Sequence, residues 1–311
     1  MRVVYMATGD IAIPSLHRLI GFPGIELVAV YTQPDRPFGR KLELHPPEIK
    51  THAQAAGLPV FQPERLSDPE ALEALRGLQP DLIVVMAYGQ ILRRAVLKLP
   101  PLGCINLHAS LLPRHRGASP IQAAIREGDS ETGITVMHVA PALDSGDVIH
   151  AKSIPILPGE TGGSLHDRLA ELAPEALAEA LPGLLSGTAP RTPQDANLAT
   201  YLGKLSREDG ALDWTRPATD IERWIRAFDP WPGTYTEWQG QKLKLFPPVG
   251  LLEASGRPGE ILQAEGDDLV VACGTGAIAL RELQIEGRKR LDVRAFLAGQ
   301  RDALQPGHQL G

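Results

Sequence analysis

The chain has 311 residues, of which 43% are hydrophobic and 22% are charged, and its formal net charge is −6. This length predicts two domains, each large enough to bury a core of its own. The negative charge excludes a global attraction to nucleic acid, so any contact with a polyanion has to come from local groups of Lys and Arg.

The cysteines and the N-terminus indicate where the protein works. Cys104 and Cys273 lie far apart and belong to no metal or disulfide motif, which favours a reducing compartment and no metal. The first apolar stretch is broken at Thr8, Gly9 and Asp10, too early for a signal peptide or a membrane span. We therefore expect a cytoplasmic protein outside the membrane, acting as a monomer.

The first half of the chain alternates predicted strands and helices. Helical patterns cover residues 46–56 and 69–75, the second with Asp68 as its expected N-cap, and a longer amphipathic helix follows Ile156. The alternation predicts an α/β domain, Rossmann-like, with a largely parallel sheet. Five apolar runs are the predicted buried strands: Arg2 to Ala7, Glu26 to Thr32, Asp81 to Tyr88, Cys104 to His108 and Gly133 to Val139.

The second half predicts a linker and a smaller β domain. From Pro182 to Asn197 the chain is rich in Pro, Gly, Thr and Ser, and we place the linker at 190–200, between a catalytic domain at 1–189 and a second domain at 201–311. A helix at 221–228 and short alternating runs separated by turn residues predict a small, OB-like antiparallel β-barrel. The predicted strands are 234–238, 242–246, 259–263, 269–272 and 277–283.

One predicted strand carries two polar residues on the same face. Asn106 and His108 are two apart, so their side chains project together at the end of the strand, where open α/β sheets place ligands. The following residues, 110–120, hold Pro, Gly and Arg in a pattern that requires a shaped loop. On residues alone, a core histidine with a structural amide remains the alternative, and Asp144 equally suits a turn.

The stretch NLHASLLPRHRGASP, residues 106–120, resembles the signature of the folate-dependent formyltransferases, and Leu143 to Asp147 is similar to the segment that carries the family's catalytic aspartate. The resemblance implies that a formyl group passes from 10-formyltetrahydrofolate to an amine without a metal. It also implies catalytic roles for three residues: Asn106 donates to the oxyanion, His108 donates to that oxygen or protonates the leaving nitrogen, and Asp144 orients the imidazole. The implied folate contacts are Ser110, Leu111, Leu112, Pro113, Met86, Tyr88, Gly89 and Ile91.

The acceptor is implied by three further segments, residues 31–41, 87–92 and 225–232, which resemble the branch of the family that formylates methionine on initiator tRNA. Initiator methionyl-tRNA is then the partner, with Arg36, Arg40 and Lys41 reaching its phosphates and basic residues of the second domain as a weaker surface. Two departures suggest a reshaped first loop and fewer tRNA contacts: Gly9 replaces the family's proline, and Glu43 falls in the basic loop.

Three other functions fit the sequence less well. A formyltransferase acting on an amino sugar nucleotide is the nearest alternative, and a non-catalytic RNA-binding module is a remote one, because the composition provides no obvious basic surface. A nicotinamide oxidoreductase is disfavoured, since only Gly9 follows the first strand where a GxGxxG motif is needed.

Overall fold

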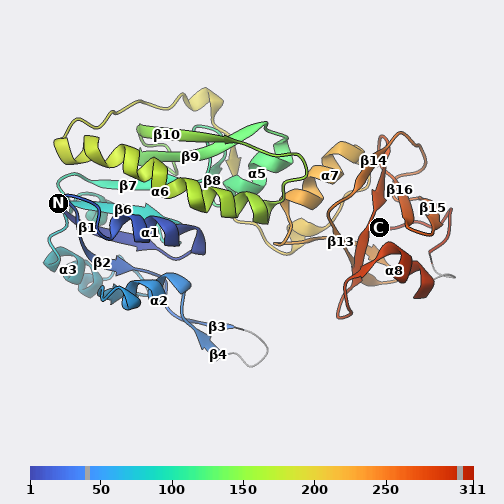
Figure 1. Cartoon of the computed structure of the whole chain (residues 1–311), viewed down its shortest axis with the longest axis horizontal. Coiled ribbons are helices and arrows are strands. Elements are labelled where there is room, and N and C mark those ends of the chain that lie inside the picture. The colour runs from blue at the N-terminus through green and yellow to red at the C-terminus, as the bar shows by residue number, and fades with distance from the viewer. Residues whose placement is uncertain (39–42, 300–303) are drawn as a thin grey trace. The chain divides into compact units, whose positions relative to one another are not determined.

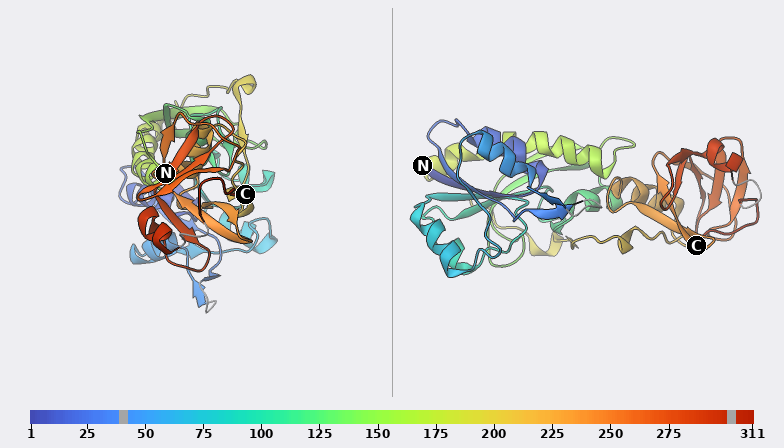
Figure 2. Two further views of the ribbon diagram at one scale, coloured as in Figure 1. Left: turned by 90° about the vertical axis from the view of Figure 1, so that its right-hand side faces the viewer. Right: turned by 90° about the horizontal axis from the view of Figure 1, so that it is seen from below.

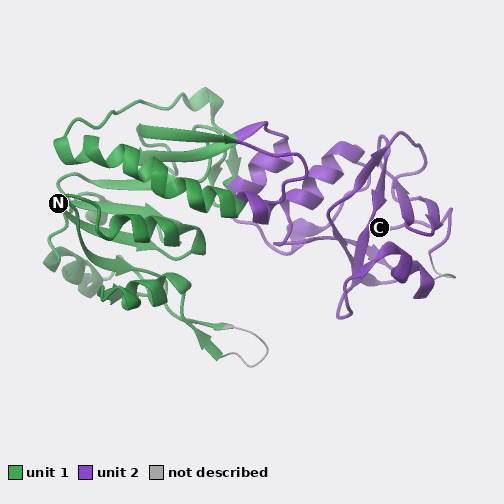
Figure 3. Ribbon diagram, in the orientation of Figure 1, with its two compact units in different colours: residues 1–120, 132–154, 166–202 green, residues 121–131, 155–165, 203–311 purple. Residues whose placement is uncertain are grey.

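The computed structural model, drawn in Figure 1 and from two further directions in Figure 2, describes residues 1–38, 43–299 and 304–311. The chain divides into two compact units (Figure 3). Unit 1 holds Met1–Pro120, Thr132–Ile154 and His166–Leu202, and unit 2 holds Ile121–Glu131, Pro155–Leu165 and Gly203–Gly311. The predicted domain limits at 189 and 201 stay predictions.

Unit 1 contains most of the elements of the first two thirds of the chain. Its strands are β1 (Arg2–Ala7), β2 (Glu26–Tyr31), β3 (Arg36–Phe38), β4 (Glu43–His45), β5 (Val60–Phe61), β6 (Leu82–Met86), β7 (Cys104–His108), β8 (Arg116–Gly117), β9 (Glu131–His138), β10 (Val148–Pro155) and β11 (Tyr201–Leu202). The helices along this part of the chain are η1 (Asp10–Ala12), α1 (Ile13–Leu19), α2 (Glu48–Ala55), α3 (Pro69–Gly77), α4 (Arg94–Leu97), α5 (Pro120–Glu127), α6 (Gly162–Ser186) and η2 (Ala196–Leu198).

A seven-stranded sheet with the order β10-β9-β7-β6-β1-β2-β5 is the centre of unit 1. The five predicted strands are all present, and the pairs among β1, β2, β5, β6 and β7 are parallel, which confirms the α/β prediction. The sheet is mixed rather than wholly parallel, because β9 runs antiparallel to β7. In the right-hand view of Figure 2, α1, α2 and α6 lie on one side of this sheet and α3 lies on the other.

The linker-like composition that begins at Pro182 does not end the preceding helix. The helix α6 continues to Ser186, with Pro174 and Pro182 inside it. A proline inside a helix costs about 3 kcal/mol, but each buried leucine returns roughly 1.5–3 kcal/mol, and both Leu181 and Leu184 are buried. Asp68 is at the N-cap position of α3, as predicted, although its side chain makes no capping hydrogen bond.

Unit 2 is built on two antiparallel sheets with the orders β12-β13-β18-β19 and β14-β17-β16-β15. The structure thus confirms the antiparallel strands, while the OB-like barrel stays a prediction; the predicted run 277–283 divides into two strands, one in each sheet. The elements are η3 (Glu208–Gly210), α7 (Ala218–Ala227), β12 (Thr234–Trp238), β13 (Gln241–Phe246), β14 (Gly250–Leu252), β15 (Ile261–Glu265), β16 (Asp268–Ala272), β17 (Ala277–Leu280), β18 (Glu282–Ile285), β19 (Leu291–Asp292) and α8 (Val293–Gly299).

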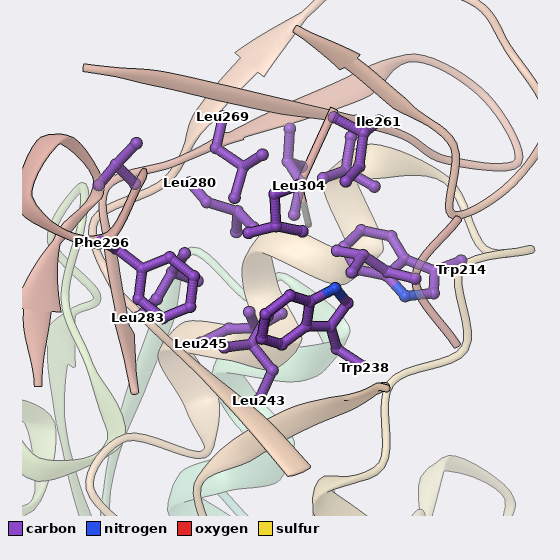
Figure 4. Close-up of a cluster of buried hydrophobic side chains, with 14 of the residues drawn as sticks. Trp214, Trp238, Leu243, Leu245, Ile261, Leu269, Leu280, Leu283, Phe296 and Leu304 are labelled. Carbon is purple, nitrogen blue, oxygen red and sulfur yellow. The ribbon is translucent and has the colours of Figure 1, made fainter. Parts of the chain in front are cut away.

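The core of unit 2 gathers two tryptophans with aliphatic side chains from both sheets and from α8 (Figure 4). Trp214 is buried there, and its indole nitrogen donates a hydrogen bond to Thr236 Oγ1 at 2.9 Å, so the polar group of this large side chain is satisfied. Across the described part of both units, no helix is long and apolar enough to span a bilayer.

Candidate active site

The strand β7 places Asn106 and His108 on one face, as the alternation of side chains predicts. Asn106 lies opposite Val85 of β6 and Met137 of β9, so it is held from both sides. Its side chain is half-buried and makes no hydrogen bond to any residue within the described ranges. An amide that can donate is therefore left free for a ligand.

His108 is buried, with 6% of its surface exposed, and its ring has a fixed hydrogen bond. Its Nε2 lies 2.8 Å from the backbone oxygen of His115, which can only accept, so Nε2 carries a hydrogen. Burial lowers the pKa of His108, and the nearby Asp144 opposes this shift only in part. The resting imidazole is therefore neutral, with a lone pair on Nδ1. In this resting state the hydrogen on Nε2 is engaged by His115, so a proton for transfer has to be taken up at Nδ1, and the catalytic role of His108 stays a prediction.

Asp144 faces that lone pair across a short gap. Its Oδ2 lies 3.7 Å from Nδ1 of His108, too far for a hydrogen bond, and accepts one from the backbone N–H of Gly117 at 2.8 Å. Asp144 also has a φ of 46°, an uncommon conformation for a residue other than glycine. If His108 takes up a proton at Nδ1, this contact becomes a buried ion pair, so the two residues form a proton-accepting pair.

The loop after β7 is tied to β9 by side-chain hydrogen bonds. Ser110 Oγ donates to the backbone oxygen of Arg114 at 2.7 Å. Thr135 Oγ1 donates to the backbone oxygen of Ser110 at 2.6 Å and accepts from the N–H of Leu112 at 3.1 Å. These bonds hold the irregular loop that the sequence predicted and bring His115 and Gly117 to His108 and Asp144.

The predicted folate contacts differ widely in exposure. Met86, Tyr88 and Ser110 are buried, Leu111, Leu112 and Pro113 are half-buried, and Ile91 is 86% exposed. Around Gly89, the backbone oxygen of Tyr88 accepts from Thr8 Oγ1 at 2.9 Å and from Gln33 Nε2 at 3.3 Å. Hydrogen bonds thus hold both loops in place, and the assignment of their residues to folate stays a prediction.

The predicted tRNA contacts are described only in part. Arg36 is exposed and has a long contact of 3.7 Å with Glu64, whereas Arg40 and Lys41 lie outside the described residues. In unit 2, Arg294 pairs with Asp267 at 2.6 Å and Arg290 pairs with Glu282. These ion pairs neutralise part of the positive charge expected on that surface.

Sequence reasoning missed the contribution of residues 190–202, which it assigned mainly to a linker. The strand β11 pairs in parallel with β8 of the loop after β7, Tyr201 opposite Arg116 and Leu202 opposite Gly117. Thr200 Oγ1 accepts from the N–H of His115 at 2.8 Å. No local pattern could have revealed this pairing, because its partners are about 85 residues apart.

Comparison with known proteins identifies the class. Residues 2–181 match the family model described as formyl transferase, and residues 204–301 match formyl transferase, C-terminal domain, so the chain belongs to the formyltransferase family. Methionyl-tRNA formyltransferases are among its relatives. That of Akkermansia muciniphila is 51% identical over 305 residues, covering 96% of each chain. That of Geobacter sulfurreducens is 47% identical, covering 100% of this chain and 97% of its own.

Solved structures confirm the fold at lower identity. WlaRD, a sugar 3N-formyl transferase, superimposes with a TM-score of 0.65 at 14% identity, covering 93% of this chain and 99% of its own. HypX from Aquifex aeolicus, solved in complex with tetrahydrofolic acid, gives a TM-score of 0.61 at 20% identity, covering 96% of this chain and 47% of HypX. This chain therefore spans about half the length of HypX.

Proposed function

We propose that this chain transfers the formyl group of 10-formyltetrahydrofolate to the amino group of methionine on initiator tRNA. Support comes from the full-length likeness to methionyl-tRNA formyltransferases at 47–51% identity. The observation that carries the chemistry is the free amide of Asn106 on the same strand face as a neutral His108 that is backed by Asp144.

The residues present suit a formylated folate. That co-substrate supplies a formyl carbon bonded to a nitrogen that can leave. A free, half-buried amide is the donor that an oxygen gaining negative charge requires, so Asn106 stabilises the oxygen of the formyl group as the amine adds. The loops around Ser110 and Gly89 wall the folate pocket.

The neutral imidazole handles the proton. When the methionine amine forms its bond to the formyl carbon, the nitrogen gains positive charge and must lose a proton. Nδ1 of His108 accepts this proton, and the carboxylate of Asp144 stabilises the imidazolium that results. The same proton then passes to the departing nitrogen as its bond to the formyl carbon breaks, which returns His108 to its neutral state.

The setting of the reaction follows from the acceptor. We place the enzyme in the cytoplasm with initiator tRNA, where free, buried thiols such as Cys104 and Cys273 remain reduced. We propose a monomer as the working form, because all three catalytic side chains belong to one chain. Arg36, together with Arg40 and Lys41, contacts the phosphates of the tRNA.

The test compares two acceptors in separate reactions. The protein is incubated with 10-formyltetrahydrofolate and either initiator methionyl-tRNA or an amino sugar nucleotide, and the formylated product is measured. Formylation of methionyl-tRNA alone is expected. Formylation of the sugar alone would identify the alternative, and tRNA binding without turnover would indicate an RNA-binding module.

A further inference from the structure

Gln194, in the segment of residues 190–202, binds the backbone of Asp144. We propose that Gln194 is a positioning residue for formyl transfer: its carboxamide holds the backbone of Asp144 so that the Asp144 carboxylate stays beside His108. The inference rests on the proposed function for its catalytic readout and uses contacts within unit 1 only.

The amide nitrogen of Gln194 binds the loop that carries Asp144. Nε2 donates to the backbone oxygen of Asp144 at 2.9 Å and to the backbone oxygen of Gly146 at 2.8 Å. Both hydrogens of the NH₂ group are therefore used. Since a positive φ is an uncommon and strained conformation for a residue other than glycine, the bonds from Gln194 help the backbone of Asp144 to keep its shape.

The amide oxygen of Gln194 binds the opposite loop. Oε1 accepts from Nε of Arg116 at 3.1 Å and from a terminal nitrogen of the same guanidinium at 2.7 Å. Arg116 is buried, and its other terminal nitrogen donates to the hydroxyl of Tyr201 at 2.9 Å. The acceptor end of the carboxamide faces two nitrogens of one guanidinium and the donor end faces two backbone oxygens, so its orientation is fixed.

These bonds close a ring around the catalytic carboxylate. Arg116 precedes Gly117, whose N–H donates to Oδ2 of Asp144, while Gln194 joins Arg116 to the backbone oxygen of Asp144. Asp144 is thus held at its side chain from one direction and at its backbone from the other. Movement of this loop would change the 3.7 Å distance between Oδ2 of Asp144 and Nδ1 of His108, on which stabilisation of the imidazolium depends.

Two variants separate the bonds of Gln194. Gln194→Glu keeps an acceptor for Arg116 but loses the donors and places negative charge against two backbone oxygens. Gln194→Met keeps the length of the side chain and removes all of these bonds. Asn197→Ala is the matched control, because Asn197 is exposed on the same segment and its side chain makes no hydrogen bond within the described residues.

Two measurements are made on the full-length protein. The first is kcat and KM for formylation of methionyl-tRNA, where we expect kcat to fall roughly tenfold to a hundredfold in both variants, with KM for 10-formyltetrahydrofolate within about twofold of wild type. The second is hydrogen exchange at the amide of Gly117, which exchanges faster once Asp144 no longer holds it. The control should match wild type in both.

The outcomes distinguish this inference from the proposed function. A kcat close to wild type in both variants, or unchanged exchange at Gly117, overturns the positioning role. A general loss of stability would lower the melting temperature and speed exchange throughout unit 1 without a selective fall in kcat, which also overturns it. If the wild-type protein formylates no methionyl-tRNA, the proposed function fails, and exchange at Gly117 still decides whether Gln194 positions Asp144.

Discussion

Replacing Asp144 with Asn tests whether the negative charge of Asp144 stabilises His108 when its ring is protonated. The substitution keeps the size of the side chain and an acceptor for the Gly117 N–H, but it removes the charge that stabilises a protonated His108. At the 3.7 Å that separates Oδ2 from Nδ1, two unit charges interact by about 4.5 kcal/mol at an effective dielectric constant of about 20. Both side chains are largely buried, so solvent screens this interaction little. Loss of the whole amount slows proton uptake roughly a thousandfold.

The assay is single-turnover formylation of methionyl-tRNA, with tetrahydrofolate binding measured alongside. We expect Asp144→Asn to lower the rate about a thousandfold while binding stays near wild type. Asp147→Asn is the matched control, because this neighbouring carboxylate is more exposed and its contact with Arg191 is long, at 3.9 Å. A rate for Asp144→Asn within tenfold of wild type would refute the reasoning, since the charge would then contribute little to the barrier.

Three further predictions concern the oxyanion, the backbone and pH. Asn106→Ala should lower kcat roughly a hundredfold to a thousandfold, as loss of an oxyanion donor does, and unchanged kcat would remove its role. Gly146→Ala should destabilise the protein by about 3 kcal/mol in urea unfolding, because a Cβ there would lie 1.7 Å from the backbone oxygen of His138. Gly77→Ala is the control, because a Cβ at Gly77 would meet open space. The hydrogen bond to Asp10 raises the pKa of His166 to about 9, so this ion pair stabilises the fold fully below about pH 6.5 and is lost as pH rises through about 9. His166→Gln should therefore lower the free energy of unfolding by about 1 kcal/mol at pH 6.5, a value that is reduced because Asp10 is exposed. At about pH 10 the same substitution should change the free energy of unfolding by nothing measurable. An equal loss at both pH values would contradict the ion pair.

The order of elements could be predicted wherever a local pattern reports burial. The apolar runs of β1, β6 and β7 identify strands that are buried on both faces, and the alternation within β7 places Asn106 and His108 together. Prediction failed where a distant contact outweighs a local rule. The prolines of α6 indicate a helix end, but burial of Leu181 and Leu184 keeps that helix intact beyond Pro182. The antiparallel pairing of β9 with β7 likewise could not be predicted, because it depends on the path that the chain takes between these two strands.

The sequence by itself determined the family, the types of side chain that we propose for catalysis and the α/β plan, because motifs and periodicity are properties of neighbouring residues. Only the tertiary structure decided the state of those side chains. His108 is neutral because folding buries it and aims Nε2 at the backbone of His115. Asp144 is restrained by Gln194, a residue 50 positions away, in a segment whose composition resembles a linker. Burial and long-range hydrogen bonds depend on the path of the whole chain, and no short window of sequence records them.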